Sequence, residues 1–151
     1  MAGRGFHSRR ARVAGALLRR IVTDASALTE YLLRTPRGRS IEQAVTAPDA
    51  ELHAPALCDV EVVSVLRRGL LARSLSARRA AEAVSHYLLL PLRRHGHMGL
   101  LERVLSLRHN FSAYDASYVA LAELLNAEIV TADAPLAQAI RTHSKLRVLS
   151  A

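Results

Sequence analysis

The sequence contains no tryptophan and only one cysteine, and its aromatic residues make up 4% of the chain. Cys58 therefore has no partner for an internal disulfide, and a reducing compartment, the cytoplasm, is expected. It lies in an apolar run, where a buried and chemically inert thiol is expected. Because aromatic residues are scarce, the core has to be built from leucine, valine, isoleucine and alanine.

Long apolar runs are also missing. No stretch reaches the ~18 uncharged apolar residues that a membrane-spanning helix needs, so we expect no membrane span. A length of 151 residues suits a single domain with a substantial core.

Acidic residues are absent from the first 20 positions, which hold six arginines. The whole chain carries a formal net charge of +8, so most of the excess positive charge lies in this segment. We expect residues 1–19 to form a basic arm, either flexible or the product of a gene start assigned too far upstream, and residues 20–151 to form the folded domain. Such an arm suits contact with nucleic-acid phosphates. It lacks the apolar core of a signal peptide.

Short apolar segments alternate with longer segments of helical periodicity after residue 20. The pattern predicts strands at residues 20–24, 52–54, 91–94, 128–131 and 147–149. It predicts helices at residues 26–34, 37–47, 55–72, 76–90, 100–108, 112–125 and 133–143, with Ser26 as a possible N-cap of the first. This alternation predicts an α/β domain with a short, mostly parallel central sheet flanked by helices.

Three acidic residues occupy similar positions in this pattern. Asp24 and Asp133 each end a strand and precede a helix, and Asp115 lies in the first turn of a helix. Ligands of open α/β sheets bind outside the carboxyl ends of the strands. Taken singly, each of the three is also explained by helix capping.

Glu61 is a fourth acid, placed among valines. A glutamate there is costly unless it is paired or coordinated, so a salt bridge to Arg67 or Arg108 is one interpretation. If the four acids converge at ~6 Å, each pair of like charges costs ~3 kcal/mol at an effective dielectric of ~20. A hard divalent cation, Mg²⁺ or Mn²⁺, would offset this repulsion and activate water.

Four segments, residues 21–28, 55–61, 114–123 and 130–133, resemble the PIN domain, and more narrowly the VapC toxins of bacterial toxin–antitoxin pairs. The resemblance extends from about residue 20 to 149 and implies a PIN-like fold. It also implies a Mg²⁺- or Mn²⁺-dependent endoribonuclease that cleaves RNA and inhibits translation or growth. Asp24 and Asp115 would be the direct metal ligands, while Glu61 and Asp133 would complete the catalytic pocket directly or through water.

The resemblance further implies that Ser26 and Thr131 support the acids by hydrogen bonding. It implies a homodimer, a VapB-like antitoxin that plugs the active site, and an RNA substrate of the tRNA or rRNA class. The sequence departs from the family at Ser64, where asparagine is frequent. A non-catalytic PIN-like binding or regulatory module is the alternative, although four mutually repelling carboxylates have no evident use there. A HAD-like phosphatase is disfavoured, because it needs an aspartate where Ser26 stands.

Several other features have two interpretations. His95 and His97 could form a metal site, but a solvated loop is the simpler expectation. The arginine pairs 67–68, 78–79 and 93–94 either contact RNA phosphates or lie on solvated helix faces. Tyr114 and Tyr118 either stack on a base or pack against a helix. The apolar face expected over residues 57–71 suggests docking of a partner helix or a second copy.

Overall fold

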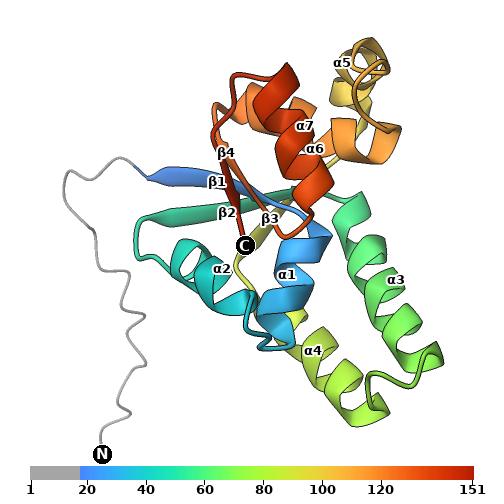
Figure 1. The fold of residues 1–151 in the computed structure, drawn as a ribbon. Coiled ribbons are helices and arrows are strands. Elements are labelled where there is room, and N and C mark those ends of the chain that lie inside the picture. Colours follow the sequence, from blue (N-terminus) through green and yellow to red (C-terminus); the bar gives the residue numbers. More distant parts are fainter. Residues whose placement is uncertain (1–17) are drawn as a thin grey trace, which may run out of the picture.

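The computed structural model describes residues 18–151, so residues 1–17 of the expected basic arm lie outside the described range. Five strands alternate with helices along the chain (Figure 1). In chain order the elements are β1 (Arg19–Thr23), α1 (Ala25–Leu32), α2 (Gly38–Val45), β2 (Ala50–Pro55), α3 (Leu57–Leu71), α4 (Ala77–Leu89), β3 (Leu92–His95), the 3₁₀ turn η1 (Met98–Leu100), α5 (Leu101–Ser106), α6 (Ala113–Leu125), β4 (Glu128–Thr131), α7 (Ala134–His143) and β5 (Val148–Ser150).

The five strands form one sheet in the order β3-β2-β1-β4-β5, and all its neighbouring pairs are parallel. The predicted α/β class with a parallel sheet is confirmed. The chain first moves from β1 towards β3 and then returns to β4 on the other side of β1. The strand order therefore reverses between β1 and β4, which is where open parallel sheets bind ligands.

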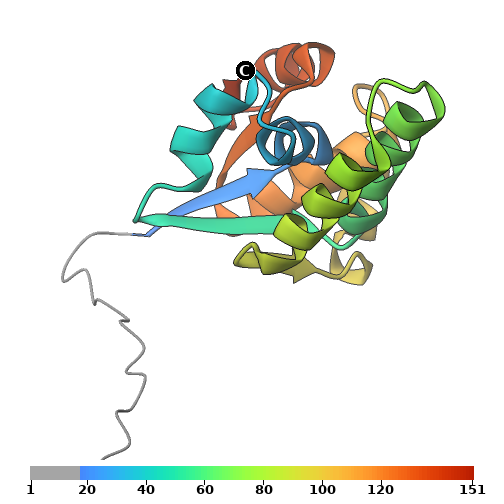
Figure 2. The same cartoon turned by 90° about the horizontal axis from the view of Figure 1, so that it is seen from below.

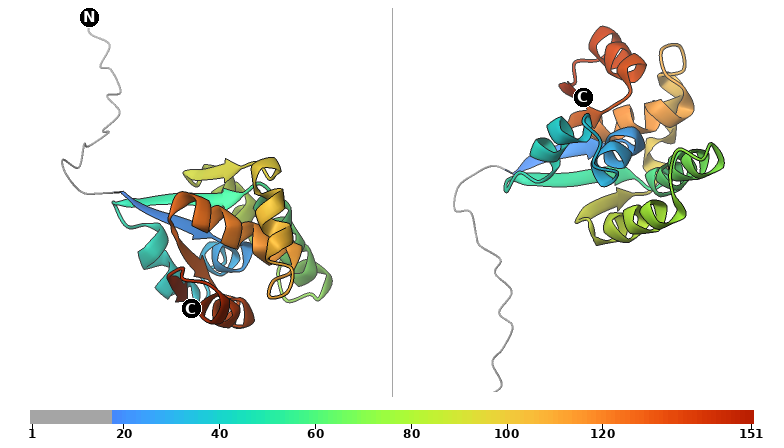
Figure 3. Two further views of the ribbon diagram at one scale, coloured as in Figure 1. Left: turned by 90° about the horizontal axis from the view of Figure 1, so that it is seen from above. Right: turned by 60° about the horizontal axis from the view of Figure 1, so that its bottom comes forward.

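Helices cover both faces of the sheet. Figure 2 shows α1 and α2 in front of β1 and β2, and the left view of Figure 3 shows α6 on the opposite side. Strands buried on both faces carry continuous apolar runs in place of alternating ones. Ile21 and Val22 in β1 and Ile129 and Val130 in β4 are accordingly all buried.

The core contains the side chains that the composition led us to expect. Leucine, valine, isoleucine and alanine supply most of it, and Cys58 is buried among them. Burial raises the pKa of the Cys58 thiol to about 11, so the thiol stays protonated at neutral pH. The prediction of a buried, inert thiol is confirmed. Within residues 18–151, no helix is long and apolar enough to cross a membrane.

One close approach between α1 and α2 requires glycine. A Cβ atom on Gly38 would lie 2.4 Å from the backbone oxygen of Glu30. The first helical turn of α2 can therefore pack against the end of α1 only because residue 38 has no side chain.

One local prediction, the N-cap of the first helix, was wrong. The first helix begins at Ala25 and its N-cap is Asp24, not Ser26, because Asp24 reaches the backbone N–H of Ala27. The apolar residues expected on one face of α3 are mostly exposed or half-buried, in keeping with the suggested docking surface. Of those expected on it, only Leu66 is buried, and Val60 and Val63 remain 72% and 53% exposed.

Candidate active site

The four acids predicted from the sequence line one cavity of about 450 Å³. Asp24 follows β1, and Asp133 follows the neighbouring strand β4. Glu61 lies in the second turn of α3, and Asp115 lies in the first turn of α6. Four elements that are far apart in sequence thus bring carboxylates together at the carboxyl edge of the sheet.

Asp24 is the most buried of the four, with 5% of its surface exposed. Its Oδ1 accepts hydrogen bonds from the Ser26 hydroxyl at 2.8 Å and the Ala27 N–H at 2.9 Å. Its Oδ2 accepts one from the Thr131 hydroxyl at 2.5 Å. A carboxylate offers roughly four acceptor positions, so about one remains available on Oδ2.

The hydroxyls that donate to Asp24 each also accept a backbone N–H. The Ser26 oxygen accepts the N–H of Ala132 at 3.0 Å, and the Thr131 oxygen accepts the N–H of Asp133 at 3.0 Å. An ionised carboxylate can only accept hydrogen bonds, so each hydroxyl donates its own proton to Asp24. The loop after β4 is thereby linked to the start of α1.

Burial raises the pKa of Asp24, and the charge of Asp133 adds to the increase. The hydrogen bonds from Thr131, Ala27 and Ser26 act in the opposite direction and favour the ionised form. Asp24 is therefore a carboxylate whose charge is unfavourable in the domain but whose orientation is fixed.

Glu61 is half-buried, and its Oε2 accepts a hydrogen bond from the hydroxyl of Tyr118. Its pKa is raised by burial and by the charges of Asp24 and Asp115. The sequence-based alternative, a salt bridge to Arg67 or Arg108, was wrong, because no ion pair in the described part of the chain involves Glu61.

Asp133 combines the capping role with a place in the cavity. It is the N-cap of α7, where its Oδ1 accepts the N–H of Leu136 at 2.9 Å. Asp115 differs, because the cap of α6 is Ser112 and the N–H of Asp115 donates to that hydroxyl at 3.1 Å. Burial and the charge of Asp133 raise the pKa of Asp115, so the Asp115 carboxylate interacts electrostatically with the neighbouring acid.

The arrangement fits a hard divalent cation in its chemistry. Every predicted ligand is a carboxylate oxygen, the donor type preferred by Mg²⁺ and Mn²⁺. Across residues 18–151 no three His, Cys, Asp or Glu side chains are gathered tightly enough to form a ready metal cage. The carboxylates of Asp24, Glu61 and Asp133 are engaged in hydrogen bonds with neighbouring protein groups.

Further residues line the cavity wall. They come from α3 and α6 and include Ser64, Val65, Arg68, Tyr114 and Tyr118. Arg68, Tyr114 and Tyr118 were considered as RNA contacts from the sequence, whereas Ser64 and Val65 were not assigned to the site. Helical spacing carried the signal: Arg68 is seven residues from Glu61, and Tyr118 is three from Asp115, so each shares a helix face with an acid. Base stacking by Tyr118 is ruled out, because its side chain is buried and bonded to Glu61.

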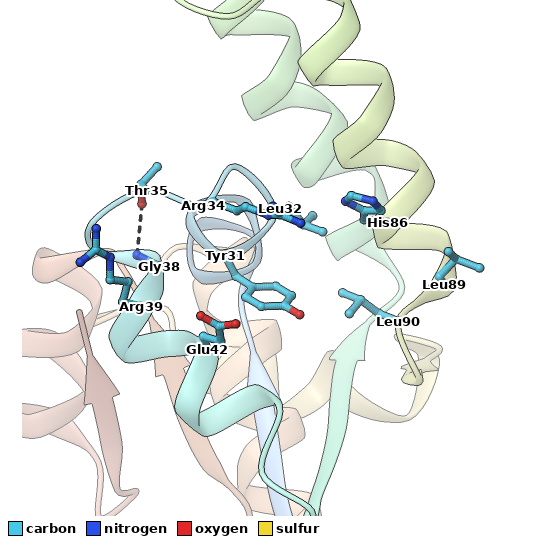
Figure 4. A pocket seen from close by; sticks show the side chains of 10 residues that line it. All are labelled: Tyr31, Leu32, Arg34, Thr35, Gly38, Arg39, Glu42, His86, Leu89 and Leu90. Atoms are coloured by element: carbon cyan, nitrogen blue, oxygen red, sulfur yellow. Dashed lines mark hydrogen bonds between the residues drawn. The ribbon is translucent and has the colours of Figure 1, made fainter.

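A larger cavity, of about 700 Å³, lies elsewhere. Figure 4 shows its walls, which come from the end of α1, the loop that follows it, the start of α2 and the end of α4. It mixes arginines with leucines and holds none of the four acids. The candidate active site is therefore identified by its clustered carboxylates and not by the size of its cavity.

The two histidines after β3 are less solvated than expected. His95 Nε2 lies 2.9 Å from the Nδ1 of buried His53, and His97 Nε2 accepts the N–H of Leu57 at 3.2 Å. They tie β3 to β2 and to the start of α3, so the prediction of a solvated loop was wrong. Arg94 is likewise engaged, in an ion pair with Asp59.

The chain is similar in sequence to known proteins over most of its length. A family model described as PIN domain matches residues 21–141. VapC ribonuclease Mb0985 of Mycobacterium bovis is 43% identical over 113 residues, which cover 75% of this chain and 85% of that protein. Ribonuclease VapC12 of Mycobacterium tuberculosis is 33% identical over 130 residues, covering 86% of this chain and 99% of that protein.

Solved structures share the fold at lower identity. A protein from Pyrobaculum aerophilum, PAE2754, superimposes with a TM-score of 0.66 at 19% identity, covering 93% of this chain and 90% of its own. VapC20 of Mycobacterium tuberculosis, described as a Sarcin-Ricin loop cleaving toxin, gives 0.59 at 17% identity, covering 79% and 94%. At these identities the likeness concerns the fold alone.

Proposed function

Because this chain belongs to the PIN domain family and, within it, to the VapC ribonucleases, we propose that Asp24, Glu61, Asp115 and Asp133 are its catalytic acids. The chain is an endoribonuclease of the toxin type that hydrolyses phosphodiester bonds in RNA. The observation that carries the assignment of the acids is their gathering in one cavity at the point where the strand order reverses.

Mg²⁺ or Mn²⁺ is the cofactor that the four carboxylates suit best. When bound, such an ion lowers the pKa of a water molecule and stabilises charge on the phosphoryl oxygens. Asp24 and Asp115 are the first candidates for direct contact. The free acceptor position on Asp24 Oδ2 supports this role, and the hydroxyls of Ser26 and Thr131 hold the carboxylate in place.

Glu61 is the acid best suited to accept a proton from the attacking water. Burial and neighbouring charge raise its pKa, which moves it towards the range where a carboxylate is an effective base at neutral pH. Tyr118 fixes one of its oxygens, while no described residue donates to the other, Oε1. Asp133 contributes negative charge beside Asp24 and Asp115.

The partners follow from the family and from the surface. We propose a VapB-like antitoxin that covers the acidic cavity, a substrate of the tRNA or rRNA class, and action in the cytoplasm. We also propose a homodimer, which the exposed apolar side chains of Val63 and Leu71 on α3 support. Size-exclusion chromatography with light scattering tests the dimer, and a soluble monomer at micromolar concentration would contradict it.

Replacing Asp24 or Asp115 by asparagine tests the catalytic assignment. Each variant should lose at least 100-fold of its RNA cleavage rate in Mg²⁺ or Mn²⁺ while its circular dichroism spectrum remains that of the wild type. Asp49→Asn is the matched control, because Asp49 is an acid in the turn before β2 and does not line the cavity. Cleavage by Asp24→Asn at the wild-type rate would refute the mechanism.

The alternative, a non-catalytic binding module, is not favoured by the ribonuclease relatives. Calorimetric titration with Mn²⁺ separates the two functions. The wild type should bind the ion and Asp115→Asn should bind it at least tenfold more weakly, whereas a module without a metal site would show no binding in either case.

A further inference from the structure

Helix α3 presents a continuous strip of side chains to the acidic cavity. Glu61, Ser64, Val65 and Arg68 all line it, and their spacing of three, four and seven residues places them on one helix face. From Glu61 to Arg68 the strip extends about 10 Å along the helix axis. The neighbouring Arg67 is also exposed but does not line the cavity.

Arg68 carries an uncommitted positive charge beside the acids. Its Nη1 donates to the Ser64 hydroxyl at 3.2 Å, and it takes part in none of the ion pairs found among residues 18–151. If its role were to neutralise the carboxylates, it would pair with one of them. Its exposed guanidinium is instead held by Ser64 at the edge of the cavity, where an incoming anion can meet it.

Tyr114 lies on the wall formed by α6, next to Asp115. Its side chain is 66% exposed, in contrast to the buried Tyr118 one helical turn later. No described residue forms a hydrogen bond with its hydroxyl, and packing does not explain its position. An exposed aromatic ring beside a nucleic-acid site provides a surface on which a base can stack.

We propose that Arg68 and Tyr114 form a subsite for a nucleotide of single-stranded RNA that flanks the bond to be cut. Arg68 binds a phosphate of that strand, and Tyr114 stacks on a base. The inference rests on the proposed function, because it takes the four acids to be the point of cleavage. Neither contact reads the identity of a base, so the subsite contributes affinity and not sequence preference.

Arg68→Gln tests the phosphate contact, with Arg67→Gln as a control that removes the same charge from the same helix. The assay is steady-state cleavage of a short single-stranded RNA in Mn²⁺ at several salt concentrations. Arg68→Gln should raise KM roughly fivefold or more, with kcat within about twofold of the wild type. It should also reduce the slope of log(1/KM) against log salt by about 0.7. Arg68→Lys should keep the slope, and Arg67→Gln should leave KM unchanged.

Tyr114→Ala tests the base contact by a physically different readout. It should raise KM at least fivefold without changing the salt slope, because stacking involves no counterion release. Tyr114→Phe keeps the ring and should match the wild type. Leu124→Ala removes another exposed apolar side chain of α6, away from the cavity, and should also match it.

The subsite is refuted if Arg68→Gln and Arg67→Gln give the same KM and salt slope, or if Tyr114→Ala leaves KM unchanged. A fall in kcat alone would place Arg68 at the reaction centre and also refute it. Failure of the proposed function has a separate signature, namely a wild-type protein that cleaves no RNA in metal. In that case fluorescence anisotropy with the same RNA still tests whether Arg68 and Tyr114 bind it.

Discussion

Thr131 and Ser26 are small residues with a large influence on Asp24. Thr131 is fully buried, and its hydroxyl connects the Asp24 carboxylate to the backbone N–H of Asp133. One side chain, that of Thr131, thus connects Asp24 to the backbone of Asp133. Thr23, the residue before Asp24, is equally buried, but its hydroxyl has no hydrogen-bond partner among the described residues.

Thr131→Val should reduce RNA cleavage by roughly 10- to 100-fold, because groups that orient a metal ligand have effects of this size. It should also shift the acidic limb of the pH–rate profile to higher pH, since the Thr131 hydrogen bond lowers the pKa of Asp24. A pH–rate profile between about pH 5 and pH 8 measures both effects. Thr131→Ser should restore most of the activity.

Thr23→Val is the control for this prediction. It makes the same change in a buried site that lacks a hydrogen bond, so activity and the pH profile should stay unchanged and stability should be equal or higher. If both valine variants shift the profile equally, the effect comes from packing and not from the Asp24 hydrogen bond.

Strand ends and helix starts made the positions of Asp24, Asp115 and Asp133 predictable from sequence, and the resemblance to the PIN domain placed them with Glu61 in one pocket. Glu61 was predictable from its cost among valines, but its partner was not. Tyr118 of α6 reaches Glu61 of α3 by a side-chain hydrogen bond between residues 57 positions apart. Which of Arg67 and Arg68 faces the cavity likewise depends on the rotation of α3 about its axis. The sequence does not determine this rotation, because the apolar residues of α3 are only partly buried.

Within residues 18–151, two helices begin with a serine cap, and one of them carries Asp115, a proposed catalytic acid. Ser112 accepts the N–H of Asp115 at the start of α6, and Ser76 accepts the N–H of Arg79 at the start of α4. The first cap also favours the ionised form of Asp115 by lowering its pKa. The two caps should therefore contribute similarly to the stability of the fold, but only the Ser112 cap should affect Asp115.

Ser112→Ala and Ser76→Ala should each lower the free energy of unfolding by about 1 kcal/mol, the usual value of a serine N-cap. Only Ser112→Ala should also weaken metal binding and cleavage, because it loosens the turn that positions Asp115. Urea unfolding and Mn²⁺ titration of both variants measure the two effects. Equal loss of cleavage in both would show that α6 has no special role.

Most elements could be predicted because their periodicity and capping signals agree with the final packing. The helices at residues 76–90 and 112–125 and the strand at 128–131 appear with boundaries within one residue of the prediction. The extent of β2 was underestimated, because its first residues, Ala50 and Glu51, become strand only by pairing with Arg19 and Arg20 of β1. Such pairing is a property of the sheet and leaves little local signal.

In the whole molecule, the acidic cavity and buried His53 give opposite dependences of stability on pH. Burial raises the pKa values of Asp24, Glu61 and Asp115 above those of the unfolded chain. Their contribution is therefore fully present below about pH 4 and is lost as pH rises through the folded values. Burial lowers the pKa of His53, whose contribution is lost as pH falls below about 6.5.

Metal-free protein should consequently be most stable in mildly acidic solution and lose stability as pH rises to about 8, with Mn²⁺ reversing the loss by binding the ionised carboxylates. At a Mn²⁺ concentration about 100 times the Kd, the gain is about 2.7 kcal/mol, or a Tm increase of roughly 5–10 °C. Thermal unfolding in EDTA and in Mn²⁺ across this pH range measures both the loss of stability with pH and the gain from Mn²⁺.

Asp24→Asn should be more stable than the wild type in EDTA near pH 8 and gain little from Mn²⁺, because asparagine keeps the cap but removes the buried charge. A wild-type Tm that rises steadily with pH in EDTA and ignores Mn²⁺ would mean that the carboxylates are not electrostatically strained, and the physical case for a cation in this cavity would fail.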